Sequence, residues 1–248
     1  MTQPPERVFF DVAKEVYSLN SKPELDGFRL AKDTPTIDAY VSDETKTIVI
    51  GIRGTNPSDV SDILADIRTI TSRLTTTTRY QYDKAFVEKI FREFPGYSVF
   101  LAGHSLGGAM ATQLKRDFPQ IKTAITFNPA FQSKDLISSP PNIVRIYSSA
   151  DPLYRLGGKM IASRVIQADT LNPLKAHFLD IFNKYYANQP AETAGQRNLR
   201  KFRENGNHFR PQVDPLTQPS LAVPSVSAPV QSSSSVVPEP ASLSQETL

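Results

Sequence analysis

Ser105 stands between two glycines at the point where an apolar segment gives way to a helical pattern. In the stretch FLAGHSLGG, residues 100–108, Gly103 and Gly107 lie on either side of the serine. A sharp strand-to-helix turn needs residues without a Cβ at its crowded positions, and it presents the central side chain outward. We therefore expect Ser105 to act as a nucleophile.

A serine hydroxyl is a poor nucleophile at neutral pH and needs a histidine to take its proton. The chain has three histidines. His104 adjoins the serine and its ring would have to fold back toward the hydroxyl, so we expect it to pack beside the turn. His177, which follows the last predicted strand, is the candidate base. His208, in a basic stretch near the C-terminal end, is the alternative.

A carboxylate must fix the imidazole tautomer, and α/β enzymes of this kind place it between the serine and the histidine in the chain. The aspartates in that interval are Asp117, Asp135, Asp151 and Asp169. Asp117 falls on the helix after the serine, too close in sequence to return to the strand ends. Asp151 follows a predicted strand and precedes Pro152, which stiffens the turn. We therefore take Asp151 as the candidate acid and Asp169 as the alternative.

Attack on a carbonyl creates an oxyanion that needs hydrogen-bond donors already in place. The residue after the nucleophile usually supplies one backbone N–H, which here belongs to Leu106. In IVIGIRGTNPSD, a predicted strand runs out into Arg53, Gly54 and Thr55. The glycine permits a tight bend, and Thr55 offers both an N–H and a hydroxyl as the second donor.

Alternating strands and helices must position these residues. Apolar periodicity predicts helices over 6–19, 83–94 and 106–118, and strands over 36–41, 46–52, 97–103, 122–128, 142–147 and 163–168. The first two strands should be antiparallel. Strands that alternate with helices imply an α/β fold with a mainly parallel central sheet covered by helices on both faces. Ligands of such sheets bind beyond the carboxyl ends of the strands, where the candidate residues lie.

A chain of 248 residues can form one α/β domain. From residue 211 onward it is rich in Pro and Ser and has no aromatic residue. Such a segment cannot offset its ordering entropy by burial. We therefore expect a folded domain over 1–210 and a disordered C-terminal tail over 211–248.

Several motifs together resemble the fungal-type class 3 lipases, a branch of the α/β-hydrolase fold. They are VAKEVYS, IVIGIRGTNPSD with DILADI after it, FLAGHSLGGAMAT, AITFNPA and SSADPLYRL. The resemblance covers roughly residues 6–185. The sequence GHSLGG flanked by a strand and a helix, with the upstream Arg-Gly-Thr at the expected distance, is its most specific part.

The resemblance implies that Ser105 is the nucleophile, Asp151 the acid and His177 the base. It makes Thr55 and Leu106 the two oxyanion-hole residues. The chain lacks the disulfides and the signal that secreted members commonly carry, and its spacing from serine to histidine is compact.

In these lipases the segment after the first oxyanion residue contains a lid, which implies a lid region over 57–80 here. Val60, Ile63, Leu64 and Ile67 fall near one face of a potential helix in this segment. That face would contact either an acyl chain or the core.

We expect a serine esterase that hydrolyses carboxylic ester bonds of lipids, as a triacylglycerol lipase or a phospholipase does, with no cofactor and no metal. A basic body, with no Lys or Arg beyond residue 210, favours work at a membrane or lipid-droplet surface. The alternatives are a catalytically silent scaffold on the same fold, and acyl transfer, amide or thioester cleavage by the same triad.

Composition bears on location and partners. The chain has no cysteine, which favours a reducing compartment, and its first residues lack the pattern of a secretory signal. No segment is apolar enough to span a membrane, so we expect a cytoplasmic protein. A modest basic excess without a readable motif gives no support to nucleic-acid binding. The oligomeric state is left open.

Overall fold

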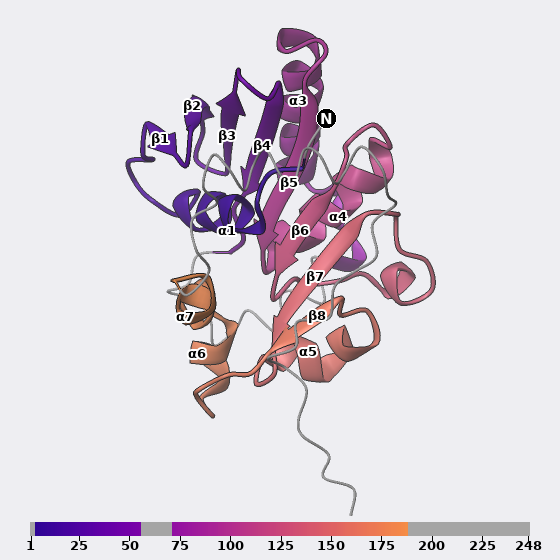
Figure 1. Cartoon of the computed structure of the whole chain (residues 1–248). Helices are drawn as coiled ribbons and strands as arrows, with labels where there is room; N and C mark the ends of the chain where they lie inside the picture. The colour runs from indigo at the N-terminus through magenta and orange to yellow at the C-terminus, as the bar shows by residue number, and fades with distance from the viewer. Residues whose placement is uncertain (1–2, 56–70, 188–248) are drawn as a thin grey trace, which may run out of the picture. The chain divides into compact units, whose positions relative to one another are not determined.

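The computed structural model describes residues 3–55 and 71–187, which form an eight-stranded sheet with helices on both faces (Figure 1). The strands are β1 (Glu24–Leu25), β2 (Phe28–Asp33), β3 (Ile37–Ser42), β4 (Thr47–Ile52), β5 (Ser98–His104), β6 (Ala124–Phe127), β7 (Ile143–Ser148) and β8 (Arg164–Ile166). The α-helices are α1 (Glu6–Glu15), α3 (Thr78–Glu93), α4 (Leu106–Asp117), α5 (Pro152–Leu156), α6 (Pro173–His177) and α7 (Asn183–Ala187). Short 3-10 helices are η2 (Leu74–Thr76), η3 (Ser133–Leu136), η4 (Gly158–Met160) and η5 (Leu179–Phe182).

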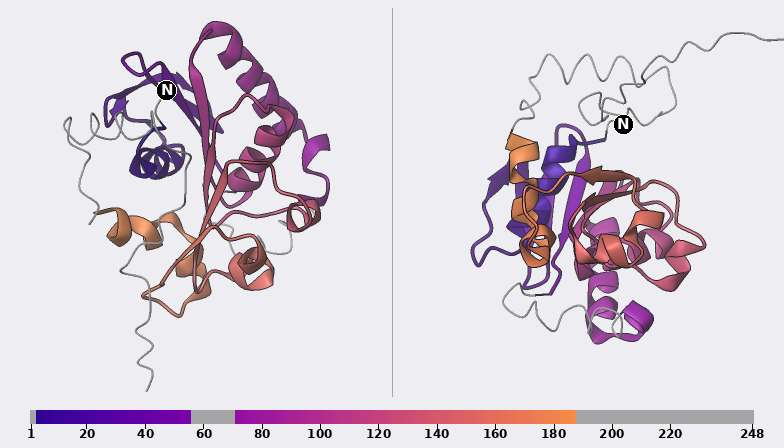
Figure 2. Two further views of the ribbon diagram at one scale, coloured as in Figure 1. Left: turned by 45° about the vertical axis from the view of Figure 1, so that its right-hand side comes forward. Right: turned by 90° about the horizontal axis from the view of Figure 1, so that it is seen from below.

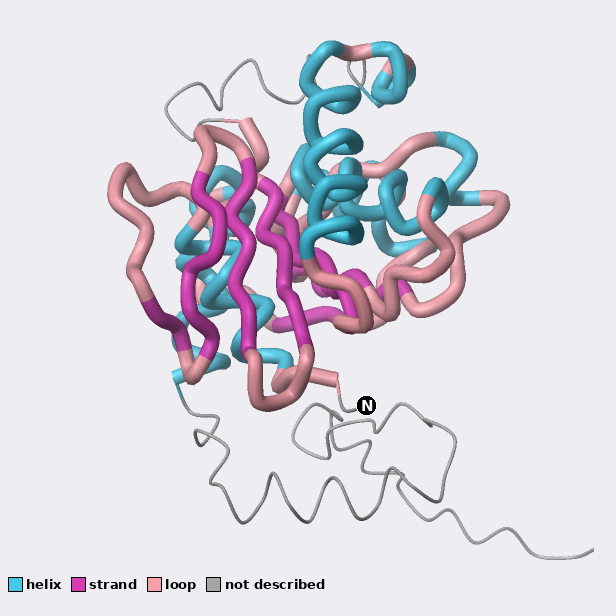
Figure 3. Tube along the Cα trace, turned by 90° about the horizontal axis from the view of Figure 1, so that it is seen from above, coloured by secondary structure: helices cyan, strands magenta, loops and turns pink. Residues whose placement is uncertain are grey.

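The strands lie in the sheet in the order in which they occur in the chain. Strands β1 to β4 pair antiparallel, and every pair from β4 to β8 is parallel. Figure 3 shows the strands side by side with helices on either side. The predicted α/β class, with its mainly parallel sheet and its antiparallel first pair, is confirmed. The carboxyl ends of all the parallel strands therefore lie at the same end of the sheet. The candidate site residues come in the segments that follow these ends.

Alternating side chains divide the core into two layers, one on each face of the sheet. On one face Val49 and Phe100 pack against α1, η5 and α7. On the other face Ile50 and Leu101 pack against α3 and α4. Figure 2 shows α1 and α4 on opposite sides of the sheet. This period-two alternation in β4 and β5 is what a sheet buried on both faces requires.

Two predicted helices have different ends in the structure. The first helix was predicted to reach Leu19 but ends at Glu15, after which the chain tightens into bonds between residues three apart and leaves Leu19 exposed. The helix predicted to begin at residue 83 begins at Thr78, because the side chain of Thr77 accepts a hydrogen bond from the N–H of Tyr80. That bond satisfies one of the donors that the first turn of a helix leaves unpaired.

A β-hairpin at the edge of the sheet is absent from the sequence prediction. Strands β1 and β2 are joined by Asp26 and Gly27, which both have positive φ, at 46° and 79°. An Asp-Gly pair between two short strands is a strong signal for such a turn. The alternation in β2 is weak because this strand lies near the sheet edge and buries little besides Phe28.

Some sequence predictions concern residues that lie outside the described ranges. These are most of the lid region, 57–70 with its four apolar residues, the histidine at 208 and the tail at 211–248. The remainder of the lid region, 71–80, contains η2 and the start of α3. Within residues 3–55 and 71–187, no helix is both long enough and apolar enough to cross a membrane.

Candidate active site

Ser105 lies in a strained turn between β5 and α4, residues 103–107, which we call the serine turn. Its φ is 55° and its ψ is −125°, a conformation that residues with a Cβ rarely adopt. Backbone crowding explains the flanking glycines. A Cβ on Gly103 would lie 2.5 Å from the carbonyl oxygen of Gly107, and a Cβ on Gly107 would lie 2.1 Å from that of Ile52. Neither contact is sterically tolerable, so both positions require glycine.

His177 is the last residue of helix α6, and its ring lies against the serine. The ring atom Nε2 is 2.9 Å from Ser105 Oγ, and both side chains are almost fully buried. Asn172 caps the start of the helix, because its side chain accepts hydrogen bonds from two backbone N–H groups of the first turn. Pro173 at the first helical position has the φ that a helix requires. The sequence thus starts a helix that is just long enough to carry this histidine.

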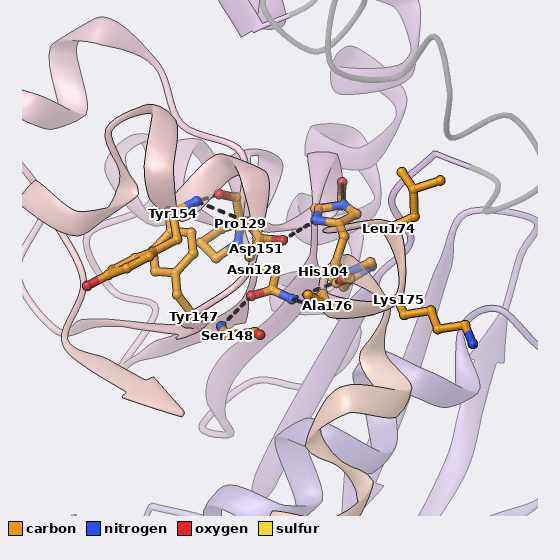
Figure 4. Close-up of polar contacts among 12 residues, drawn as sticks. His104, Asn128, Pro129, Tyr147, Ser148, Asp151, Tyr154, Leu174, Lys175 and Ala176 are labelled. Carbon is orange, nitrogen blue, oxygen red and sulfur yellow. Dashed lines mark hydrogen bonds and ion pairs between the residues drawn. The ribbon is translucent and has the colours of Figure 1, made fainter. Parts of the chain in front are cut away.

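Asp151 completes a hydrogen-bonded line with these two residues. Its Oδ2 lies 2.5 Å from His177 Nδ1, and its other oxygen, Oδ1, accepts a hydrogen bond from the N–H of Tyr154. Asp151 directly precedes α5, and Figure 4 shows its carboxylate beside the backbone of Tyr154. Because both oxygens are engaged and the residue is fully buried, the carboxylate has a fixed orientation.

The contacts of this line assign the protons. A carboxylate accepts, so His177 Nδ1 carries the hydrogen, and Nε2 is left as the acceptor for the hydroxyl of Ser105. This is the tautomer in which a histidine can take a proton from a serine.

The alternative aspartates lie in other surroundings. Asp169 is exposed in the loop after β8. Asp117 accepts hydrogen bonds from Tyr80, Lys84 and Gln113 at the far end of α4. Asp135 pairs with Arg116. Among the described residues, Asp151 is therefore the aspartate that the structure brings to His177.

The two predicted oxyanion residues line one cavity of about 520 Å³. Thr55 follows β4 and Leu106 opens α4, and Pro35 and Met110 add apolar surface. The bend between β4 and the threonine brings Gly54 so close that a Cβ there would lie 3.3 Å from Ser105 Cβ. The close approach of this glycine places the end of β4 directly beside the serine.

A second series of hydrogen bonds, which the sequence analysis missed, connects the end of β4 to His177. The N–H of Gly54 donates to the hydroxyl of Tyr17, and Tyr17 lies 3.0 Å from His104 Nδ1. His104 Nε2 lies 2.8 Å from the carbonyl oxygen of His177. A carbonyl can only accept, so Nε2 carries the hydrogen of His104 and Tyr17 donates to Nδ1.

Burial keeps the ring of His104 neutral. Burial, and then the neighbouring His177, lower the pKa of His104 from 6.5 to about 3. Both of its ring nitrogens are engaged, so it packs beside the serine turn as the sequence predicted. Tyr17 had a sequence signal, because it lies in one of the motifs that carry the resemblance. A motif alone does not show which distant groups a phenol will reach.

Asn128, at the end of β6, is a further residue that the sequence analysis did not single out. Its carboxamide contacts the backbone of α6 and the backbone of β7 (Figure 4). The asparagine lies in the motif AITFNPA, but neither its composition nor its spacing indicates those partners. Within the described residues, no three His, Asp or Glu side chains converge in a way that could hold a metal ion.

Residues 53–181 match the Hydrolase_4 family model, which is described as serine aminopeptidase, S33. This match spans just over half of the chain. The chain belongs to this family. The matched residues begin at the bend that follows β4 and end after α6, so they include all five predicted site residues.

Individual relatives are more distant. Over 94 residues the chain is 39% identical to a GDSL esterase/lipase of Arabidopsis thaliana, an alignment that covers 34% of this chain and 26% of that protein. The chain thus spans about a quarter of the length of this relative.

Similar solved structures include several lipases. A lipase of Rhizopus microsporus var. chinensis is 17% identical with a TM-score of 0.45, over 65% of this chain and 72% of that one. A lipase of Yarrowia lipolytica is 16% identical with a TM-score of 0.43, over 65% and 76% of the two chains. A triacylglycerol lipase with a serine protease triad is 16% identical with a TM-score of 0.46, over 67% and 80%.

Proposed function

We propose that this member of the Hydrolase_4 family is a serine esterase that hydrolyses carboxylic ester bonds of lipids. The observation that carries the proposal is the buried line from Asp151 through His177 to Ser105, with bonds of 2.5 Å and 2.9 Å. The 2.9 Å between Ser105 Oγ and His177 Nε2 is a distance at which a base can remove a hydroxyl proton. The line ends beside the cavity that Thr55 and Leu106 share.

In the proposed mechanism, Ser105 Oγ attacks the ester carbonyl while its proton passes to His177 Nε2. Asp151 stabilises the imidazolium that forms. The carbonyl oxygen becomes an oxyanion, which accepts hydrogen bonds from Thr55 and from the backbone N–H of Leu106. When the C–O bond breaks, the imidazolium protonates the leaving alcohol, and an acyl-serine remains.

Water then resolves the acyl-serine by the reverse sequence. His177 takes a proton from the water, the hydroxide equivalent attacks the acyl carbonyl, and the second oxyanion forms at the same donors. Collapse releases the carboxylic acid as Ser105 recovers its proton from the imidazolium. Each step uses groups of this chain, the ester and water, so no cofactor or metal is required.

The substrate class rests on the lining of the cavity. Pro35, Leu106 and Met110 present apolar surface next to Thr55, which suits an acyl chain. We propose a triacylglycerol or phospholipid ester as substrate, met at a membrane or lipid-droplet surface that the positive net charge favours.

Amide cleavage is the second candidate, because the family model is described as a serine aminopeptidase. The same triad serves esters, amides, thioesters and acyl transfer, and fold alone does not select among them. A silent scaffold would need no buried, aligned triad, so this alternative is the weaker one.

The deciding experiment compares wild type, Ser105→Ala and the matched control Ser133→Ala, whose serine is exposed on η3. Each is assayed on p-nitrophenyl esters of increasing chain length, p-nitroanilides, emulsified triacylglycerol and phospholipid vesicles. We expect ester turnover that rises on aggregated lipids, is lost in Ser105→Ala and is kept in Ser133→Ala. Faster anilide turnover would favour the amidase, and a folded wild type without any turnover would overturn the esterase.

A further inference from the structure

Asn128 occupies an unusual backbone position directly after β6. It is fully buried, has a φ of 40° and precedes Pro129. A residue before proline prefers an extended conformation, and positive φ is uncommon outside glycine. Such a conformation persists only where the surrounding contacts determine it. The contacts made by this side chain show what the conformation achieves.

On one side, the carboxamide binds the end of helix α6. Its Nδ2 donates to the carbonyl oxygens of Ala176 and His177, each at 2.9 Å. The last carbonyls of a helix have no partner within the helix, and α6 has five residues, too few to be stable by itself. Both amide hydrogens are therefore used to hold the turn from which the ring of His177 projects.

On the other side, the same carboxamide binds the end of strand β7. Its Oδ1 accepts a hydrogen bond of 2.7 Å from the N–H of Ser148. The carbonyl oxygen of Ser148 in turn accepts a bond of 3.0 Å from the N–H of Asp151. One side chain thus connects the backbone that carries the aspartate to the backbone that carries the histidine, although the two are separated by 26 positions in the chain.

We propose that Asn128 is a positioning residue that sets the orientation of His177 between Asp151 and Ser105. The inference rests on the proposed function, in which these three residues form the triad. The two bonds of the ring, 2.5 Å to Asp151 Oδ2 and 2.9 Å to Ser105 Oγ, must form in one ring orientation. A small shift of α6 would lengthen one of them and misplace the base.

The hydrogen bonds and the backbone conformation at this position favour asparagine over aspartate and glycine. Aspartate would direct a carboxylate at two carbonyl oxygens while keeping the contact to Ser148, and glycine would keep the positive φ but lose all three bonds. Asparagine alone of the three combines two donors, one acceptor and tolerance of positive φ.

The test is Asn128→Gly in the full chain, with Asn142→Gly as the matched control. Asn142 also has a positive φ, 59°, but it is exposed at the opposite end of the sheet, just before β7. Both substitutions remove the same side chain without imposing backbone strain. The measurements are kcat and KM on a soluble p-nitrophenyl ester, the rate of Ser105 labelling by a fluorophosphonate, the thermal midpoint, and the proton signal of His177 Nδ1–H.

The proton signal separates positioning from mere support of the fold. A hydrogen shared between imidazole and a buried carboxylate resonates far downfield, and the chain has three histidines, so ¹⁵N-histidine labelling and His177→Gln assign it. For Asn128→Gly we expect kcat to fall about 10- to 100-fold with KM within twofold, and the signal to broaden or vanish. Asn142→Gly should retain wild-type values throughout.

A lower thermal midpoint in Asn128→Gly with unchanged kcat, labelling and proton signal would overturn the proposal. Should that variant fail to fold, Asn128→Asp, which has nearly the same shape, serves instead. It should lose kcat and the signal, and wild-type values for both would contradict the positioning role. If the wild type hydrolyses no ester but the signal still depends on Asn128, the esterase proposal fails and the positioning role stands.

Discussion

The serine turn and helix α6 contribute the two ends of one hydrogen bond, but the fold holds them by different means. In the serine turn, backbone packs directly on backbone, because Gly103 and Gly107 leave no room for a Cβ. In α6, side chains from distant elements reach the last carbonyl of the helix. The carbonyl oxygen of His177 is 2.9 Å from the amide of Asn128 and 2.8 Å from the ring of His104.

This difference separates a locally encoded structure from a cooperatively encoded one. The turn can be recognised from five consecutive residues, whereas the placement of α6 depends on side chains after β6, at the end of β5 and, through Tyr17, after α1. The two glycines of the turn should therefore tolerate almost no substitution. The histidine should be sensitive to substitutions far away in sequence, each of them with a moderate effect.

The largest expected effect distinguishes the two adjacent histidines, whose ring centroids are 5.0 Å apart. His177→Gln removes the proposed base, so we expect kcat/KM to fall about 10⁴-fold or more. His104→Gln removes a group whose nitrogens serve only structural bonds, so we expect a loss within about tenfold. Steady-state kinetics on a soluble ester measures both, and a greater loss in His104→Gln would reverse the assignment of the base.

The next effect tests the backbone packing of the serine turn. Gly107→Ala would place a Cβ 2.1 Å from the carbonyl oxygen of Ile52, and this contact can be relieved only by moving β4 or α4. Overpacking of this kind should cost about 3 kcal/mol of unfolding free energy or more, although Ala normally favours a helix over Gly. Urea unfolding measures it.

Gly96→Ala is the matched control for that comparison. Gly96 has a φ of 82° and open space around the position of a Cβ, so the added methyl group meets backbone strain but no neighbour. We expect a cost of about 1 kcal/mol, typical of a residue with a Cβ in this conformation. Equal losses in the two variants would show that crowding at Gly107 is not what fixes the serine turn.

Much of the fold could be predicted from the sequence because its signals are local. The alternation in β4 and β5 and the glycines on either side of Ser105 are patterns visible within one element and its turn. The first helix was predicted too long because periodicity continues through Leu19, whereas the chain leaves the helical path at Glu15. The β1–β2 hairpin was missed although Asp26 and Gly27 carry its turn signal.

The candidate site shows the same division. Ser105 was proposed from its own neighbours, and His177 and Asp151 were proposed by elimination and by order along the chain. Tyr17 and Asn128 were not found, because their roles consist of hydrogen bonds to backbone groups far away in sequence. A sequence gives the type of a side chain but not the unpaired carbonyl or N–H that tertiary structure brings to it.

A smaller effect concerns acid stability and the titration of His104. The folded pKa of His104, about 3, lies below its ordinary value of 6.5, so the unfolded chain binds a proton first as the pH falls. Stability from keeping this ring neutral is present above pH 6.5 and declines as the pH approaches 3. At pH 4.5 the loss should be about 2 to 3 kcal/mol.

His104→Gln removes that titration, so its unfolding free energy should fall less between pH 7 and pH 4.5 than that of the wild type. Urea unfolding at the two pH values measures the difference. A wild-type pH dependence in the variant would mean that His104 is not the residue responsible.

The smallest effect concerns the series of hydrogen bonds that connects the end of β4 to His177. Tyr17→Phe removes the hydroxyl that accepts from the N–H of Gly54 and donates to His104. An unpaired buried N–H costs about 1 to 3 kcal/mol, and a looser end of β4 should lower kcat severalfold because Thr55 follows directly.

Tyr40→Phe is the matched control, because Tyr40 belongs to the apolar cluster against which the half-buried Tyr17 packs, and its hydroxyl donates to the carbonyl oxygen of Lys22, away from the serine. Its stability cost should be similar while its kcat stays at the wild-type value. A fall in kcat of the same size in both variants would show that activity follows global stability. A fall in kcat in Tyr17→Phe alone would show that the hydrogen bonds through Tyr17 position the oxyanion residue that follows β4. Asn128 has the corresponding role for His177.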